Sequence, residues 1–148
     1  MDKNILLIED HPDEQTLMLQ AIRKSNTKYE VMVLSDGAEA LDYLMGNGRF
    51  SQRDLKLMPS IILLDLNLPK ISGFEVLRQI KINPKTKFIP VVILTSSNER
   101  NDVEKCYALG VNSYIRKPIS FSDFSETINQ LNHYWLELNE GPPISNNK

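Results

Sequence analysis

The chain has little of what a secreted or membrane-spanning protein needs. It contains one cysteine, Cys106, in 148 residues, which excludes an internal disulfide framework and fits a reducing compartment. No apolar run approaches the ~20 residues that a membrane-spanning helix requires. Near the N-terminus only residues 5–8 are apolar before two acids, so no secretory signal is indicated. We therefore expect a cytoplasmic protein without membrane association.

An excess of charge of one sign is also missing. The chain has 17 Lys and Arg against 19 Asp and Glu residues, for a formal net charge of −2. Because nucleic acids and anionic membranes are bound through a strong basic field, this balance favours neither partner. A hydrophobic content of 41% and a charged content of 24% are typical of a globular domain, and the length suits one domain.

Residues 60–69 form the stretch around which the rest of the chain is organised. Four apolar residues, 61–64, run directly into Asp65, and Pro69 ends the segment. A short apolar run bounded by breakers is typical of a strand buried on both faces. In open α/β sheets, ligands bind in the crevice outside the carboxyl ends of such strands. Asp65 is therefore predicted at a ligand-binding position.

Four other segments predict strands, at 4–10, 29–35, 91–95 and 111–116. Helical patterns follow at 14–25 and 99–109, and after three N-cap residues, Asp36, Ser72 and Ser120. This alternation predicts a doubly wound parallel (βα)5 sheet. The first, third and fourth strands are apolar on both faces and belong in the centre, which gives the flavodoxin-like order 2-1-3-4-5. The connection 47–59 is interpreted as a solvated loop.

The last helix has more apolar residues than one face needs. The expected core face consists of Phe121, Phe124, Ile128, Leu131 and Trp135. Three others lie off it: Tyr134, Leu136 and Leu138. They either cover the sheet edge locally or form a partner surface, since exposed apolar patches usually mark contacts. We expect the domain to span 1–138 and a flexible tail to span 139–148.

The predicted strand order brings six polar side chains to one edge of the sheet: Glu9, Asp10, Asp65, Thr95, Ser96 and Lys117. Crowded carboxylates repel unless a cation lies among them or one takes a proton. A few carboxylates together with a phosphate are typical of Mg²⁺, and a carboxylate can itself form an aspartyl-phosphate. A metal, a lysine and a hydroxyl can each bind one phosphoryl oxygen. The pattern therefore predicts phosphoryl transfer.

These residues resemble the receiver domain of two-component response regulators from Asn4 to Leu138. The resemblance rests on motifs in chain order: Glu9-Asp10, Asp65 with Leu68-Pro69 and Gly73, Thr95-Ser96, and Tyr114 with Lys117-Pro118. Residues 64–70, 89–95, 106–110 and 134–136 are further similar to single-domain regulators of the cyanobacterial phytochrome type. One departure is Glu9, where the family more often has Asp.

The resemblance implies that Asp65 accepts a phosphoryl group from a phosphohistidine on a sensor histidine kinase, of phytochrome type in this subgroup. Mg²⁺ would be held by Asp10, Asp65 and the backbone carbonyl of Asn67, with Glu9 nearby. The implied phosphate-binding residues are Asp65, Asn67, Thr95, Ser96 and Lys117. The resemblance also implies a cis peptide between Lys117 and Pro118.

The implied switch is a pair, Thr95 and Tyr114, in which the tyrosine rotamer follows the threonine. The implied output is a partner surface or a homodimer formed through the fourth helix, fifth strand and fifth helix. The protein would then be a phosphoacceptor switch and not an enzyme in the ordinary sense.

Other functions are less well supported by the residues. An aspartyl-phosphate phosphatase would carry a second acid two residues after its nucleophile, where this chain has Asn67. Flavin binding would need a loop rich in glycine and hydroxyls at 11–13, which reads His-Pro-Asp. A DNA-binding output domain would need more than the ten residues after Leu138. A phosphorylation-independent, receiver-like binding module stays open as the alternative, although the complete set of acids, Thr95 and Lys117 argues against it.

Overall fold

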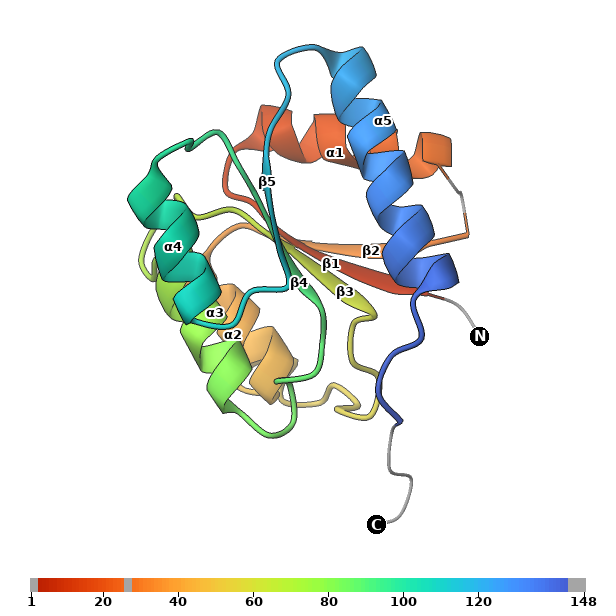
Figure 1. Cartoon of the computed structure of the whole chain (residues 1–148). Helices are drawn as coiled ribbons and strands as arrows, with labels where there is room; N and C mark the ends of the chain where they lie inside the picture. The colour runs from red at the N-terminus through yellow and green to blue at the C-terminus, as the bar shows by residue number, and fades with distance from the viewer. Residues whose placement is uncertain (1–2, 26–27, 144–148) are drawn as a thin grey trace.

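The computed structural model describes residues 3–25 and 28–143 and has one parallel sheet in the order β2-β1-β3-β4-β5 (Figure 1). The strands are β1 (Asn4–Ile8), β2 (Glu30–Leu34), β3 (Ile61–Leu64), β4 (Val91–Thr95) and β5 (Ser113–Arg116). The helices between and after them are α1 (Pro12–Ser25), α2 (Gly37–Met45), α3 (Gly73–Ile82), α4 (Arg100–Ala108) and α5 (Phe121–Asn132). The predicted flavodoxin-like α/β fold is confirmed.

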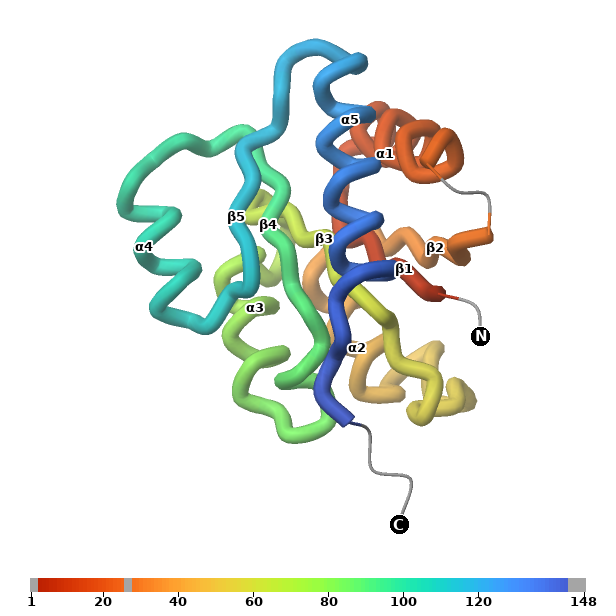
Figure 2. Tube along the Cα trace, turned by 45° about the vertical axis from the view of Figure 1, so that its right-hand side comes forward, coloured from red at the N-terminus to blue at the C-terminus, as the bar shows by residue number. Residues whose placement is uncertain are grey.

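The molecule has three layers, with α1 and α5 on one face of the sheet and α2, α3 and α4 on the other (Figures 1 and 2). Alternate residues of the central strands enter opposite cores: Leu6 and Ile8 pack toward α2 and α3, whereas Ile5 and Leu7 pack toward α1 and α5. All four residues of β3 and all five of β4 are buried, while β2 and β5 are mixed. Burial on both faces thus places the apolar strands in the centre, as predicted.

The sheet register sets where the site residues emerge. Ile8 is level with Leu64, so Glu9 and Asp65 leave neighbouring strands side by side. The ladder continues one residue further, because the Glu9 N–H donates to Leu34 O at 3.0 Å and the Asp65 N–H donates to Ile8 O at 3.1 Å. On the other side of β4, the Lys117 N–H donates to Thr95 O at 2.8 Å. The predicted residues therefore meet at one edge.

The three predicted N-caps are present. The side chains of Asp36, Ser72 and Ser120 each accept a hydrogen bond from the backbone N–H of the residue three positions later, at 2.7, 3.2 and 3.1 Å.

The connection 47–59 is largely exposed, as expected for a solvated loop, but it also has local structure. It contains the short helix η1 (Gly48–Phe50). The Arg53 guanidinium lies 4.1 Å from the Tyr43 ring centroid and donates to the carbonyls of Tyr43 and Leu57.

The end of the last helix differs from the prediction. Helix α5 continues as a π-helix, η2 (His133–Leu138), in which hydrogen bonds span five residues. The wider turn brings Leu136, five residues after Leu131, into the core at 3% exposure, so its predicted place off the core face is wrong. Phe121 is 40% exposed and also does not belong to that face. Part of the expected tail, residues 144–148, lies outside the described residues.

Candidate functional site

Three carboxylates converge where β1 and β3 end. Oxygen atoms of Glu9, Asp10 and Asp65 all lie within 4.8 Å of one another. Glu9 is 1% exposed and Asp65 is 9% exposed, whereas Asp10 faces solvent. Burial raises the pKa of Glu9, and the nearby Asp65 charge raises it further, against the lowering effect of Lys117. Carboxylates this close together repel one another, so the arrangement requires positive charge nearby.

Lys117 places its ammonium group among these acids. Its Nζ donates to Glu9 Oε1 and Glu14 Oε1, each at 2.8 Å, and lies 3.6 Å from Asp65 Oδ2. Burial lowers the pKa of Lys117, but the hydrogen bonds to Glu14 and Glu9 and the Asp65 charge outweigh it and raise the pKa above its ordinary value. The side chain is 11% exposed and remains a cation at neutral pH.

Glu14 is a site residue that the sequence analysis did not find. It lies in the first turn of α1, four residues after Asp10. A helix that begins at Pro12 turns this position back toward the end of β1. The spacing from Asp10 was the available signal, but an acid in the first turn of a helix is common because it complements the helix dipole.

The segment after β3 holds Asp65 through backbone contacts. The Asn67 N–H donates to Asp65 Oδ1 at 3.2 Å, while the Asn67 side chain is exposed. The Gly73 N–H donates to Leu66 O at 3.0 Å, and a Cβ at Gly73 would lie 2.5 Å from Leu66 Cα and closer still to the Asp65 carbonyl oxygen. Only glycine permits α3 to begin this near the strand, so Gly73 fixes the floor of the site.

Thr95 and Tyr114 are connected through Ser97, a second residue that the sequence analysis missed. Thr95 is fully buried, and its Oγ1 accepts from the Ser97 N–H at 3.4 Å. The Tyr114 hydroxyl donates to the Ser97 carbonyl at 3.1 Å. Ser97 Oγ also donates to Asp102 Oδ2 at 2.6 Å, which fixes the loop to α4. Ser96 is exposed on the same loop.

The peptide between Lys117 and Pro118 is trans, since the described residues contain no cis peptide bond. The expected cis bond is therefore wrong for this structure. A trans bond is the lower-energy form even before proline. Lys117 reaches Glu9 and Asp65 with this geometry, so a cis bond is not required to direct its side chain into the site.

The donor set fits a hard divalent cation. Glu9, Asp10 and Asp65 supply carboxylate oxygens, the ligand type that Mg²⁺ and Mn²⁺ accept. Glu9 is buried, so its negative charge is costly even beside Lys117, and a bound divalent cation would stabilise it further. Asp65 lies at the end of β3, with the Lys117 ammonium 3.6 Å from its Oδ2.

Comparison with known proteins agrees with this geometry. Residues 5–129 match the response regulator receiver domain. The chain is 40% identical over 138 residues to the probable methanogenesis regulatory protein FilR2 of Methanothrix harundinacea, which covers 93% of this chain and 86% of that protein. It is 39% identical over 135 residues to the response regulator Rcp1 of Synechocystis, covering 91% and 90%.

Two solved structures are also similar. The phosphorylated cyanobacterial phytochrome response regulator RcpA superposes with a TM-score of 0.90 at 37% identity, covering 97% of this chain and 100% of that one. The Mn²⁺-bound form of Rcp1 superposes with a TM-score of 0.86 at 38% identity, covering 95% and 99%.

The chain belongs to the response regulator receiver domain family. Its members act as phosphoacceptor switches rather than as conventional enzymes, and the relatives of this chain include phytochrome response regulators. The acidic group Glu9, Asp10 and Asp65 is consistent with a phosphoacceptor site. Among the described residues, no helix is both long and apolar enough to cross a membrane.

Proposed function

We propose that Asp65 accepts a phosphoryl group from a phosphohistidine of a sensor histidine kinase. An Asp65 carboxylate oxygen attacks the phosphorus, the new O–P bond forms, and the P–N bond breaks with its electron pair going to the imidazole nitrogen. The observation that carries the proposal is the position of Asp65: it is 9% exposed, 3.6 Å from the Lys117 ammonium and beside two more carboxylates.

The other residues hold charge around the transferred group. Asp10, Asp65, the Asn67 carbonyl and Glu9 would hold Mg²⁺, which when bound supplies positive charge to the phosphoryl oxygens. The Mn²⁺-bound structure of Rcp1 supports a divalent cation in this family. In this proposal the Lys117 ammonium binds a second phosphoryl oxygen, and the third is assigned to the hydroxyls of Thr95 and Ser96 and the Asn67 N–H.

The proposed switch runs from Thr95 to Tyr114. In the present structure the Thr95 hydroxyl accepts a hydrogen bond from the Ser97 N–H. This hydrogen bond breaks when the hydroxyl turns to donate to a phosphoryl oxygen. The loop then moves, and the Ser97 carbonyl no longer holds the Tyr114 hydroxyl in place. A charge added at Asp65 thereby changes the surface of α4 and β5.

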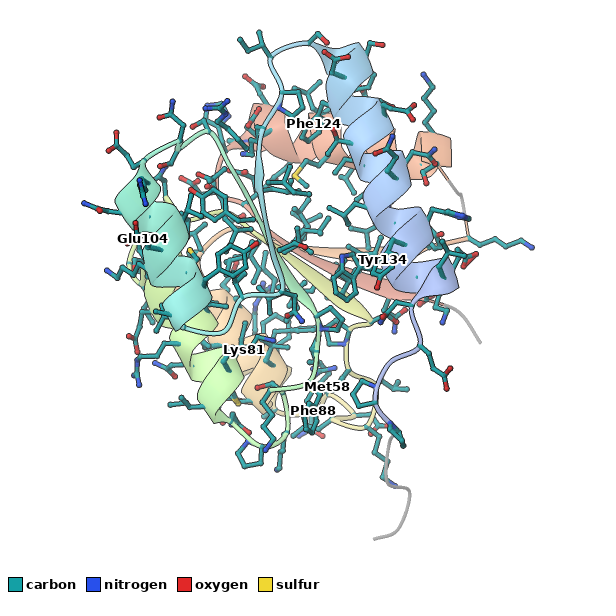
Figure 3. The ribbon with its side chains drawn as sticks, in the orientation of Figure 1. Met58, Lys81, Phe88, Glu104, Phe124 and Tyr134 are labelled. Atoms are coloured by element: carbon teal, nitrogen blue, oxygen red, sulfur yellow. The ribbon has the colours of Figure 1, made fainter. Side chains whose placement is uncertain are left out.

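The kinase is the partner that must reach Asp65. Exposed apolar side chains gather beside Lys117: Leu17 is 38% exposed, Phe121 40%, and Ile119 is fully exposed. With Phe124, which points between α1 and α5 in Figure 3, they line a hollow of about 140 Å³. Because this hollow is continuous with Lys117, it suits an apolar helix of the kinase that carries the phosphohistidine. The similarity to Rcp1 and RcpA favours a phytochrome-type kinase.

The proposed output is a second copy of the chain bound through α4, β5 and α5. Exposed apolar side chains lie on α4 and on η2, which continues α5. Tyr107 of α4 is 52% exposed. In η2, Tyr134 (Figure 3) is 48% exposed and Leu138 is 64% exposed. We place the receiver unit at 1–138, with 139–148 as its tail, and we place the exchange in the cytoplasm, between proteins rather than on nucleic acid or a membrane.

Labelling tests the phosphoacceptor role. The protein is incubated with Mg²⁺ and acetyl phosphate, and the adduct is located by intact mass and peptide mapping. Wild type and the control Asp54→Asn, in the connection after η1, should be labelled, whereas Asp65→Asn should not. If Asp65→Asn were still labelled, Asp65 would not be the phosphoacceptor. Mg²⁺ binding without any labelling would favour the phosphorylation-independent binding module.

The dimer is tested separately, by size-exclusion chromatography with Mg²⁺ and beryllofluoride, a mimic of the acyl phosphate. A shift toward the dimer that is lost in Tyr134→Ala supports the α4-β5-α5 surface. Binding of beryllofluoride without a shift would rule out dimerisation as the output.

A further inference from the structure

The Lys117 ammonium donates hydrogen bonds to two acids, Glu9 of the metal site and Glu14, which lies outside that site. Both distances are 2.8 Å, whereas Asp65 Oδ2 lies at 3.6 Å. A lysine ammonium has three N–H donors. Two of them are engaged by Glu9 and Glu14, and Asp65 Oδ2 lies beyond ordinary hydrogen-bond length from the ammonium nitrogen.

The two acids differ in what they can bind instead of Lys117. Glu9 belongs to the group of carboxylates that converge within 4.8 Å, so a divalent cation can take over its charge. Glu14 is not in that group and extends from α1, with its side chain 37% exposed. It therefore remains an anionic acceptor for Lys117 when the metal site is filled, and it competes there with an arriving phosphoryl oxygen.

Lys117 does not need Glu14 to stay at the site. Its side chain is 11% exposed, and its backbone N–H donates to Thr95 O at 2.8 Å. Glu9 alone provides a hydrogen bond of the same length as the one to Glu14. Removal of the Glu14 charge should thus weaken its hold on one donor of Lys117 without releasing the side chain from the site.

We propose that Glu14 is a positioning residue that holds Lys117 back from Asp65 and thereby weakens binding of the phosphoryl group. This inference rests on the proposed function, because it assigns Glu14 a role in setting how strongly the phosphorylated state is favoured. Glu14 on α1 then competes with the phosphoryl oxygen for Lys117, and the strength of its hydrogen bond to Lys117 sets how strongly the phosphorylated state is favoured.

Beryllofluoride binding measures this competition directly. Beryllium chloride is titrated calorimetrically into the protein with Mg²⁺ and excess fluoride. Glu14→Gln keeps the side-chain length but removes the charge. It should bind beryllofluoride about three- to tenfold more tightly than wild type, the range expected when a partly exposed ion pair becomes a hydrogen bond to a neutral acceptor. Equal or weaker binding by Glu14→Gln would overturn the proposal.

Asp13→Asn is the matched control, because Asp13 is an acid of the same helical turn. Among the described residues, the carboxylates paired with Lys117 are those of Glu9, Glu14 and Asp65. Asp13→Asn should therefore change the affinity by less than about twofold, since an exposed charge outside these ion pairs is screened by solvent and salt. If Asp13→Asn had an effect as large as that of Glu14→Gln, the affinity would depend on the overall negative charge of this helical turn. That result would refute a specific role for Glu14.

A double-mutant comparison tests whether Glu14 acts through Lys117. In a Lys117→Ala background, Glu14→Gln should lose most of its effect, and persistence of the full effect would contradict the proposal. Failure of wild type to bind beryllofluoride, together with absence of labelling at Asp65, would instead refute the proposed function itself. The two failures are thus distinguishable.

Discussion

Replacement of Gly73 by alanine tests whether the close approach of α3 holds Asp65 in position. A Cβ at this residue would lie 2.5 Å from Leu66 Cα and even closer to the Asp65 carbonyl oxygen. Both are backbone atoms at the end of a buried strand, so they cannot turn aside as the end of a flexible side chain can. Either α3 or the segment after β3 must move.

The magnitude follows from two opposing effects. Overpacking of this kind costs about 1–3 kcal/mol. Alanine also restricts the unfolded chain, which returns about 0.4–1 kcal/mol. The backbone nature of the contacts places the cost in the upper part of its range, so we expect Gly73→Ala to lower the free energy of unfolding by about 1–2 kcal/mol.

Urea unfolding measures this loss, and Gly141→Ala provides the control because a Cβ there has no atom within 4 Å. The control should stay within about 0.5 kcal/mol of wild type. Displacement of Asp65 should also slow its labelling by acetyl phosphate in Gly73→Ala. A variant as stable as the control and labelled at the wild-type rate would refute the view that Gly73 fixes the site.

Other single contacts also lead to measurable expectations. Asp36→Ala removes the acceptor of the Glu39 N–H at 2.7 Å and should cost about 1 kcal/mol in urea unfolding. That hydrogen bond holds the pKa of Asp36 below its ordinary value of 3.8. The ionised Asp36 should therefore stabilise the fold fully above pH 3.8, and this stabilisation should be lost as the pH falls through the lower pKa of the folded state. The stability of Asp36→Ala should not show this loss. Burial raises the pKa of Cys106 to about 11, so a thiol reagent should react slowly with native protein and fully in denaturant, and rapid native reaction would be inconsistent with a buried thiol. Leu136→Ala should cost about 2–5 kcal/mol in the same unfolding assay. Tyr134→Ala should cost less than half of that, and equal losses would contradict the π-helical register.

The sheet could be predicted from the sequence because its apolar runs encode burial on both faces. Strands β1, β3 and β4 read as continuous apolar segments, and only the centre of the sheet can bury them. Once that order is set, the residues after the strands must share an edge. This reasoning predicts that Glu9, Asp65 and Lys117 lie together, and Lys117 Nζ lies 2.8 Å from Glu9 Oε1 and 3.6 Å from Asp65 Oδ2.

Glu14 and Ser97 could not be found by the same reasoning, because neither directly follows an apolar strand. One is in the first turn of a helix and the other is in a loop, where an acid or a hydroxyl ordinarily serves the local backbone. Their contacts depend on the angle at which α1 and the loop after β4 leave the sheet. Hydrophobic periodicity carries no information about that angle.

The π-helix was missed for a different reason. The spacing from Leu131 to Trp135 fits an α-helix, and the spacing from Leu131 to Leu136 fits a π-helix, so both registers offer an apolar residue to the core. The structure buries Leu136 at 3% exposure and leaves Trp135 partly buried. The choice depends on the shape of the core beneath the helix, which is a tertiary property.

The strand ends and the connecting elements contribute differently to the site. The strand ends fix the carboxylates in space, because Glu9 and Asp65 continue the backbone ladder of the sheet. Lys117 is a long side chain whose donors can be redistributed among those acids and Glu14. Under the proposed function, a phosphoryl group on Asp65 would alter that distribution, and it would act on α1 through Glu14. It would act on the loop before α4 through Thr95 and Ser97. Since α1 and α4 lie on opposite faces of the sheet, one added charge would then reach both faces of the domain (Figure 1).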